Sequence, residues 1–134
     1  IYGKGTNSRE WIYVKDHCKG LFAICKKGKV GESYNIGTNN NVNNLNLTKL
    51  LLKIIKNKRI EIGSKVRIKF VKDRPGHDFR YALNSKKIRK DLNWKPDKNF
   101  KKGLEETFNW YFQNINFFKT FSKKKFFKRL GLKT

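Results

Sequence analysis

Hydrophobic and polar positions alternate along this chain with two periods, which predict helices in some segments and short strands in others. Apolar side chains at positions 18, 21, 22 and 25 fall on one stripe of a helix. Asp16 stands where an N-cap is expected, and Gly28 can end the helix in the left-handed conformation. Lysines at positions 26 and 27 suit the C-terminal end of a helix dipole. A first helix is therefore expected up to residue 27.

Three more helices follow from the same period. Leucines and isoleucines between positions 47 and 55 form a broad apolar face, and Asn46 can cap that helix. A short helix is expected over residues 85–92, where Asn93 replaces the usual terminal glycine. Residues 100–114 form another amphipathic segment.

Three short runs are typical of strands instead. Residues 11–14 and 33–36 are rich in aromatic and β-branched side chains, and residues 66–71 alternate between apolar and basic. The 134 residues fit one domain of the α/β class, built from helices with a few short strands. No apolar run reaches the roughly 18 residues of a membrane helix. The start at Ile1, without Met or a signal core, suggests a cut through a longer chain.

The net charge of +23 favours polyanionic partners such as nucleic acid, anionic lipid or phosphorylated small molecules. Lysine supplies most of this charge and asparagine is also abundant, a bias that an AT-rich genome imposes on any surface. Charge alone is therefore weak support for nucleic-acid binding. The basic and aromatic C-terminal sequence has two interpretations, a membrane-surface segment or an arm that folds back on the domain. Cys18 and Cys25 are expected to be packing thiols in a reducing cytoplasm.

Two arginines are candidates for binding phosphate, because a guanidinium fork can pair with two phosphate oxygens at once. Arg9 follows a flexible polar stretch, and Arg74 belongs to the loop DRPGHD. In that loop Pro75 fixes one backbone angle, and Gly76 permits positive φ or close approach. The turn would then hold Arg74 and His77 in a defined relative position, with His77 available to a sugar hydroxyl. A surface turn with a satisfied histidine is the alternative. No catalytic residue set can be assembled.

Several stretches together resemble the C-terminal part of the dTDP-glucose 4,6-dehydratases, a family of extended short-chain dehydrogenases/reductases. They are YGKGTNSREWIYVKDHCKGLF, GKVGESYNIG, NNLNLTKLL, FVKDRPGHDFRYALNSKKIRKDLNWKP and the closing RLGLK. They cover nearly the whole chain in the family's order. The DRPGHD loop, the LNWKP stretch and the RLGLK ending are the most specific, whereas the first and third stretches are shared among nucleotide-sugar enzymes.

The resemblance implies that residues 1–134 are the substrate-binding portion of such an enzyme. Eight residues are then expected to contact the nucleotide sugar: Tyr2 near the base, Arg9 at the diphosphate, Asn44 before the second helix, and Asp73, Arg74, Pro75, Gly76 and His77 in a loop that closes on the nucleotide. His77 is expected to help select dTDP over UDP. Glu10 stands where the family usually has Asp, but this departure does not touch the clamp.

The resemblance also implies what this chain does not carry. The family binds NAD on a Gly-rich turn and uses a Tyr-x-x-x-Lys pair and an Asp-Glu pair, and none of the tyrosines here is followed four residues later by lysine. The expected activity of the full enzyme is conversion of dTDP-glucose in deoxysugar synthesis, as a cytoplasmic homodimer, with this fragment inactive alone. The alternatives are another nucleotide-sugar epimerase, dehydratase or decarboxylase, and a small basic nucleic-acid-binding protein.

Overall fold

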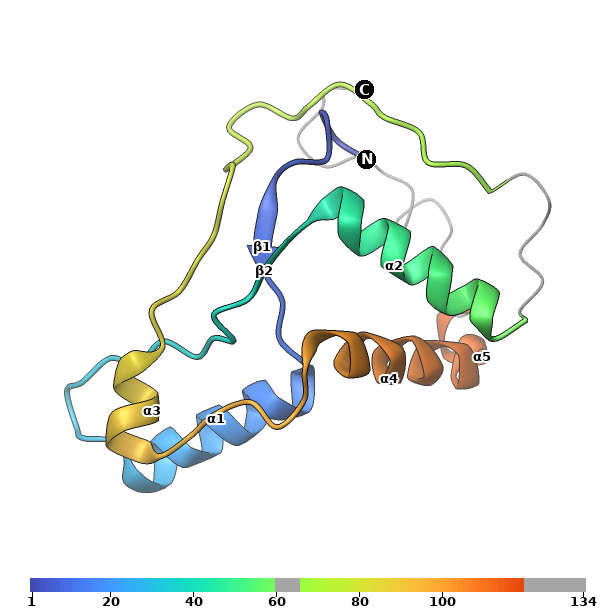
Figure 1. Ribbon diagram of the computed structural model, residues 1–134. Helices are drawn as coiled ribbons and strands as arrows, with labels where there is room; N and C mark the ends of the chain where they lie inside the picture. The colour runs from blue at the N-terminus through green and yellow to red at the C-terminus, as the bar shows by residue number, and fades with distance from the viewer. Residues whose placement is uncertain (60–65, 120–134) are drawn as a thin grey trace.

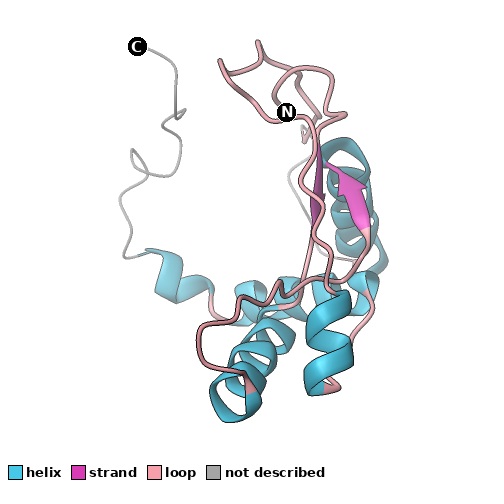
Figure 2. Ribbon diagram, turned by 90° about the vertical axis from the view of Figure 1, so that its left-hand side faces the viewer, coloured by secondary structure: helices cyan, strands magenta, loops and turns pink. Residues whose placement is uncertain are grey.

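The computed structural model of the chain describes residues 1–59 and residues 66–119. These residues form five helices and two short strands (Figure 1). In chain order they are β1 (Ser8–Glu10), α1 (Val14–Lys27), β2 (Asn41–Asn43), α2 (Asn44–Asn57), α3 (Lys86–Leu92), α4 (Phe100–Gln113) and α5 (Ile115–Lys119). α1 packs against α3, and α2 continues directly from β2. Figure 2 shows the strand pair beside α2, with loops making up most of the upper part of the molecule.

The two strands pair antiparallel, with Arg9 opposite Val42. β1 lies immediately before residues 11–14, so the β-prone pattern there predicted a strand in the wrong place. Residues 11–13 instead form the link into α1, where Trp11 Nε1 donates a hydrogen bond to the Val42 carbonyl at 3.2 Å. The strand pair therefore connects the N-terminal segment to the start of α2.

The other two predicted strands are also absent. Residues 33–36 and 66–71 form no strand in the described structure. The second run makes only an isolated parallel bridge between Val71 and Tyr2. A strand requires a neighbour that satisfies its backbone N–H and C=O groups along its length, and the second run has one only at its end, where residues 69–71 bond to residues 1–3. The coarse prediction of a helix-rich α/β chain with few strands is confirmed.

α1 begins at Val14, with Tyr13 as its N-cap and no side-chain capping bond, so the prediction of Asp16 as the cap was wrong. Asp16 is only 2% exposed, and its carboxylate accepts a hydrogen bond from the Lys98 N–H at 3.0 Å. Asp16 therefore ties the first turn of α1 to the segment that leads into α4. At the other end Gly28 has φ −65°, which is not the predicted left-handed conformation.

The buried face of α1 is not the predicted stripe. Leu21 and Phe22 are 47% and 62% exposed, and both cysteines are free and exposed rather than packed. The inward face is small and aliphatic, with Gly20 so close to its neighbours that an added Cβ would lie 2.9 Å from Ile36 Cγ2 and 3.1 Å from Trp94 Cε2. This close approach explains why a glycine occupies the middle of the helix.

A small core lies between α1, α3 and the segment before β2. Ile88, Leu92 and Trp94 are buried, and five partly buried side chains pack against them: Ile12, Ala23, Ile24, Tyr34 and Ile36. α3 is short, but Asn93 ends it at φ +51°, the predicted left-handed conformation. Trp94 can therefore return to the core immediately after the helix ends.

Asparagine side chains cap the N-terminal ends of two long helices, α2 and α4. The Asn43 side chain accepts from the Asn46 N–H at 2.7 Å, so α2 starts before the predicted cap at Asn46. The Asn99 side chain accepts from the Lys102 N–H at 3.0 Å and starts α4 at the predicted place. Both are the N-cap arrangement in which an oxygen side chain satisfies a free N–H of the first turn.

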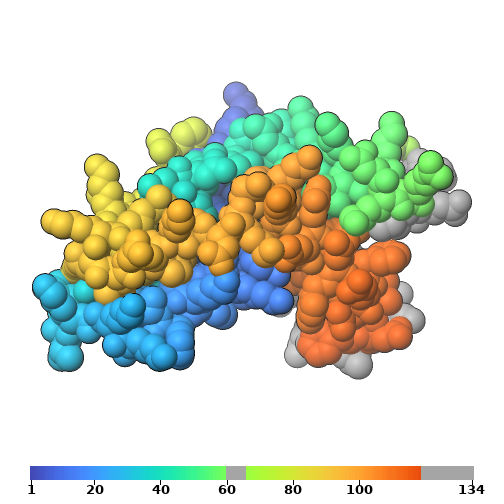
Figure 3. Space-filling model, turned by 60° about the horizontal axis from the view of Figure 1, so that its bottom comes forward, coloured from blue at the N-terminus to red at the C-terminus, as the bar shows by residue number. Residues whose placement is uncertain are grey.

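Much apolar surface remains uncovered in the described residues. Only Ile54, Ile88, Leu92 and Trp94 are buried apolar side chains in the described residues. Large apolar side chains on α1, α4 and α5 are about half exposed or more. Segments of these helices form part of the surface seen in Figure 3. None of the described helices is both long and apolar enough to cross a membrane. Most of the basic and aromatic C-terminal sequence lies outside the described residues.

The core predicts a clear difference between two truncations. Ile88→Ala should lower the free energy of unfolding by about 2–5 kcal/mol, because Ile88 is fully buried and truncation leaves a cavity. Val30→Ala removes a fully exposed side chain and should change it by no more than about 0.5 kcal/mol. Urea unfolding followed by far-UV circular dichroism measures both. Equal effects of the two substitutions would show that Ile88 is not packed in a core.

Candidate functional site

The DRPGHD loop is attached at both ends to the N-terminal residues. Before the loop, the Gly3 N–H donates to the Val71 carbonyl at 2.9 Å, and the Val71 N–H donates to the Ile1 carbonyl at 2.8 Å. After it, the Ser8 N–H donates to the Phe79 carbonyl at 2.9 Å. The loop is therefore held against the segment that carries β1, although the two are far apart in sequence.

Arg9 extends from β1 toward this loop. Its Nη1 donates to the Ser8 carbonyl at 2.7 Å, and its Nη2 donates to the Asp78 carbonyl at 2.9 Å. Its guanidinium carbon lies 4.4 Å from the centre of the Tyr81 ring, which is a cation–π distance. A guanidinium has five N–H donors, so these two bonds orient Arg9 and leave three donors for an anion.

Arg74 is placed by the turn that the sequence predicted. Pro75 and Gly76 form the turn, and Gly76 has φ +64°. An added Cβ at Gly76 would meet no atom within 4 Å, so the glycine is needed for its backbone angle and not for close approach. The Arg74 N–H donates to Asp73 Oδ1 at 2.9 Å. Its guanidinium makes no hydrogen bond or ion pair with another described residue.

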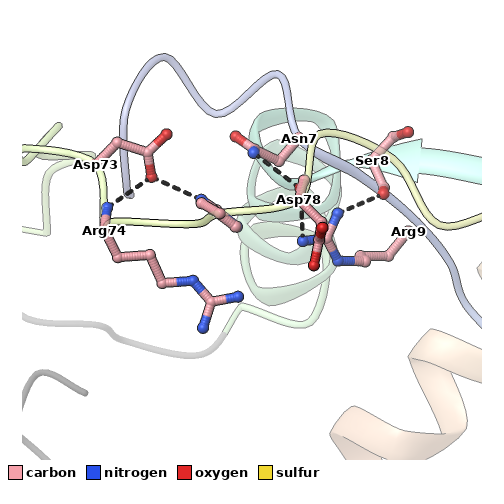
Figure 4. A network of polar contacts seen from close by, with 7 residues as sticks. Asn7, Ser8, Arg9, Asp73, Arg74 and Asp78 are labelled. Atoms are coloured by element: carbon pink, nitrogen blue, oxygen red, sulfur yellow. Dashed lines mark hydrogen bonds and ion pairs between the residues drawn. The ribbon is translucent and has the colours of Figure 1, made fainter. Parts of the chain in front are cut away.

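The two arginines share one neighbourhood around Tyr81. The Tyr81 hydroxyl donates to the Asp78 carboxylate, and this bond is the main reason that the pKa of Tyr81 is raised. The positive charges of Arg9 and Arg74 both act on the same hydroxyl and lower its pKa. Figure 4 shows both guanidinium groups on one side of the loop. The structure thus places both candidate arginines on the same side of the DRPGHD loop.

Tyr2 of the N-terminal segment forms a second cluster with Asp73 and His77 of the loop. His77 Nδ1 lies 2.6 Å from Asp73 Oδ1, and the His77 side chain is only 7% exposed. The Tyr2 ring meets the His77 ring edge-on, with 6.3 Å between the ring centres. Asp73 has a lowered pKa, chiefly because of the hydrogen bond with His77. The sequence predicted each of these residues at the site but not their mutual contacts.

Asn44 and a residue missed in the sequence connect α2 to the loop. Asn44 is the first residue of α2, and its N–H donates to the Asn7 carbonyl at 3.1 Å. Asn7 is 6% exposed, and its side-chain amide donates to the Asp78 carbonyl at 3.2 Å. Asn7 lies in a polar stretch with no periodicity, so no local pattern singled it out.

Glu10 is a second structural residue that the sequence did not assign to the site. Its carboxylate accepts from the Leu83 N–H at 2.8 Å and from the Asn39 N–H at 2.6 Å. These bonds hold the chain after Tyr81 against the segment that follows residue 36. Glu10 therefore helps to hold the segment that carries Tyr81, over whose ring Arg9 lies.

The chemistry that this arrangement supports is anion binding. Two guanidinium groups, one of them oriented by two carbonyls, suit a diphosphate better than a single charge does.

Within the described ranges, no group of three His, Cys, Asp or Glu side chains could hold a metal ion. A cavity of about 650 Å³ between the start of α1 and α4 contains neither arginine in its lining. In Figure 3 the surface is notched between α1 and the α4–α5 end.

Known proteins give this arrangement its context. Residues 1–107 match the sequence model of a family described as GDP-mannose 4,6 dehydratase. The chain belongs to the GDP-mannose 4,6-dehydratase family. The match includes both arginines, the DRPGHD loop and the first helical turns of α4, so the candidate site lies within the family region.

The similarity to individual members of the GDP-mannose 4,6-dehydratase family extends slightly further. The dTDP-glucose 4,6-dehydratase of Shigella flexneri is 42% identical over 120 residues, which are 87% of this chain and 32% of that protein. The chain spans about a third of the length of the curated relatives it matches. These numbers agree with the resemblance inferred from the sequence.

Solved structures of the same kind share the fold. The dTDP-glucose 4,6-dehydratase of Bacillus anthracis, in complex with NAD, has a TM-score of 0.78 at 38% identity and covers 89% of this chain and 36% of its own. The Streptomyces venezuelae enzyme DesIV, a dTDP-glucose 4,6-dehydratase with NAD and TYD bound, has a TM-score of 0.76 at 38% identity, over 87% and 34%.

The Asp73–His77 contact predicts a measurable titration. Asp73 should titrate below about 3.9, the usual pKa of aspartate, in carbon-13 NMR of its carboxyl group. Because the pKa of Asp73 is lower in the folded chain than in the unfolded chain, the contact stabilises the folded chain fully at pH values above the unfolded pKa. This stabilisation is lost as the pH falls through the pKa of the folded chain. His77→Leu removes the main cause and should raise the titration midpoint of Asp73. An unchanged midpoint would contradict the contact.

Proposed function

We propose that this chain is the nucleotide-sugar-binding, C-terminal portion of a dTDP-glucose 4,6-dehydratase. The complete enzyme would convert dTDP-glucose to dTDP-4-dehydro-6-deoxyglucose and water. The observation that carries the proposal is the pair of arginines near Tyr81, Arg9 on β1 and Arg74 in the DRPGHD loop. Both lie within the residues that match the family. The 42% identity to a dTDP-glucose 4,6-dehydratase supports this particular substrate.

The proposal assigns the diphosphate to the two arginines. Arg9 is held by the carbonyls of Ser8 and Asp78, and so little side-chain freedom is lost when an anion binds. Arg74 retains all its side-chain donors and completes the pairing from the loop. Pro75 and Gly76 shape the turn that presents Arg74.

The base and sugar would lie toward the other cluster and the start of α2. Tyr2 supplies an aromatic face near the base, and Asp73 and His77 line the same part of the loop. Asn44 stands at the N-terminal end of α2, where the helix dipole favours a ligand oxygen. Residues 1–134 would thus act as one substrate-binding unit.

The described residues do not fit NAD. Dinucleotide sites use parallel strands and a Gly-rich turn that opens a helix, whereas β1 and β2 are an antiparallel pair with three residues each. No hydride-transfer step therefore follows from this chain. In the proposed enzyme NAD and the catalytic groups come from residues outside these 134, and the residues of this chain position the sugar.

The uncovered apolar surface is consistent with a partial enzyme. Large apolar patches on a protein surface mark places where other protein packs. Val14, Leu21 and Phe22 along α1, and Trp110 and Phe112 on α4, remain exposed in this chain. In the complete enzyme, proposed on the resemblance alone to be a homodimer, the rest of the polypeptide would cover such faces.

The arginine pair predicts selective loss of nucleotide binding. Arg9→Lys and Arg74→Lys should each weaken dTDP binding about tenfold in isothermal titration calorimetry, because a lysine cannot make a bidentate pair with the diphosphate. Arg67→Lys is the matched control, since Arg67 is an exposed arginine on the same segment outside the loop. Equal weakening by all three substitutions would indicate binding to the basic surface in general, and the proposal would fail.

Salt dependence separates the proposal from a nucleic-acid-binding protein. Affinity for generic DNA that exceeds the dTDP affinity and falls linearly with the logarithm of salt concentration would favour the nucleic-acid alternative. The proposal expects dTDP binding that survives at salt concentrations where binding to generic DNA is lost.

A chimera tests the activity. The matching 120 residues of the Shigella flexneri enzyme would be replaced by the corresponding residues of this chain. The chimera should dehydrate dTDP-glucose, and Arg9→Lys in the chimera should raise KM for dTDP-glucose more than Arg67→Lys does. The 134-residue chain alone should show no turnover. A folded chimera that accepts UDP-glucose in preference to dTDP-glucose would place this chain with another nucleotide-sugar enzyme.

A further inference from the structure

Asp73 does more in the loop than add a negative charge. Its Oδ1 accepts the Arg74 N–H at 2.9 Å and lies 2.6 Å from His77 Nδ1. Its other oxygen faces Gly3, where an added Cβ would come within 2.7 Å of Oδ2. The carboxylate is therefore held in one orientation by neighbours from two segments of the chain.

The Tyr2 side of the cluster immobilises the His77 ring. Tyr2 meets the ring edge-on, and residues on both sides of Tyr2 are bonded to Val71. The ring is 7% exposed, so it cannot rotate freely in solvent. The contact with Asp73 sets which ring nitrogen faces the carboxylate, and Tyr2 packs edge-on against the same ring.

In this orientation the second ring nitrogen of His77 is available. Nε2 has no hydrogen-bond partner among the described residues, where the polar contact of the ring is that of Nδ1 with Asp73. Among the partly or fully buried residues described, only one side-chain nitrogen or oxygen atom is buried without a hydrogen-bond partner, and it is Arg89 Nε and not His77 Nε2. It follows that Nε2 is not sealed from solvent, and the small exposed part of the ring includes it.

The charges around His77 determine what Nε2 can offer. Asp73 contacts the ring, Arg74 and Asp78 lie in the same loop, and Tyr2 is the titratable group from the N-terminal segment. The lowered pKa of Asp73 means that its carboxylate is ionised at neutral pH and acts only as an acceptor. Facing this acceptor, Nδ1 must carry a proton.

We infer that Asp73 is a positioning residue that keeps a proton on Nδ1 of His77, so that Nε2 is the unprotonated nitrogen of the neutral imidazole form and accepts a hydrogen bond from a sugar hydroxyl of the bound nucleotide. This inference rests on the proposed function for the identity of the ligand. It concerns a hydrogen-bonding role that follows from the Asp73–His77 contact and that no sequence pattern specifies. An unconstrained neutral histidine prefers its proton on Nε2, so Asp73 reverses the intrinsic preference.

The tautomer can be measured without any ligand. In nitrogen-15 NMR at about pH 8, where histidine side chains are commonly neutral, the unmodified chain should show His77 protonated at Nδ1 and bare at Nε2. The His77→Leu spectrum separates its signals from those of His17. A His77 proton on Nε2 in the unmodified chain would overturn the inference directly.

Two aspartates in one loop provide a matched pair of variants. Asp73→Ala should move the proton to Nε2, and Asp73→Asn, which keeps an acceptor, should retain the Nδ1 form at least in part. Asp78→Ala removes the other aspartate, which bonds to Tyr81 and not to His77, and should leave the tautomer unchanged. If Asp73→Ala does not fold, Gly3→Ala displaces Asp73 without removing a polar group and should loosen the same contact.

Binding then tests the role of Nε2. Removing the 3′ hydroxyl from dTDP should weaken binding to the unmodified chain about 3- to 10-fold, the usual effect of one hydrogen bond. The same change in the ligand should have little effect on the Asp73→Ala variant. If the 3′ hydroxyl matters equally in both, the inference fails while the arginine-based proposal stands. If dTDP does not bind at all, the proposed function fails, and the tautomer measurement still decides the position of the proton.

Discussion

The carbonyl of Asp78 is the point at which the two halves of the candidate site are joined. It accepts one hydrogen bond from Arg9 and one from Asn7, across sequence separations of 69 and 71 residues. Because both donors belong to the strand segment, the loop cannot move away from β1 without breaking both bonds. A buried amide such as Asn7 that loses its partner costs about 1–3 kcal/mol, which favours the closed arrangement. The positions of Arg74 and His77 relative to Arg9 all depend on this attachment.

The acidic residues near the site mainly organise the structure, in a chain whose net charge is +23. Asp73 receives the Arg74 N–H, and Glu10 receives two backbone N–H groups from distant segments. Asp78 accepts from the Tyr81 hydroxyl beneath Arg9. Exposed ion pairs elsewhere, such as Lys87 with Glu32, are expected to contribute little. The positive charge that is placed for a particular ligand is therefore that of the two arginines. The many lysines make the surface basic in general.

The small core and the uncovered helix faces have a common origin. The apolar stripe of α1 that the sequence shows most clearly points outward, and Gly20 faces the core instead. A stripe of this kind is typical of a helix that packs on both sides, and here only the α3 side has a partner within the described residues. The chain spans about a third of its relatives' length. An exposed apolar helix face such as that of α1 is typical of a surface on which other protein packs.

The sequence by itself determined the local features that depend on neighbouring residues. The long helices, the left-handed end at Asn93, the turn at Pro75–Gly76 and the family resemblance were all predictable, because periodicity, φ preference and motif spacing are local properties. The strands predicted at residues 33–36 and 66–71 are absent, since strand formation depends on pairing with another segment and not on local pattern alone. Tertiary structure alone decided that Asn7 and Glu10 support the site, that Asp16 binds Lys98 rather than capping α1, and that Tyr2 meets His77. These contacts join segments whose approach depends on hydrogen bonds between distant parts of the backbone, which no local pattern encodes.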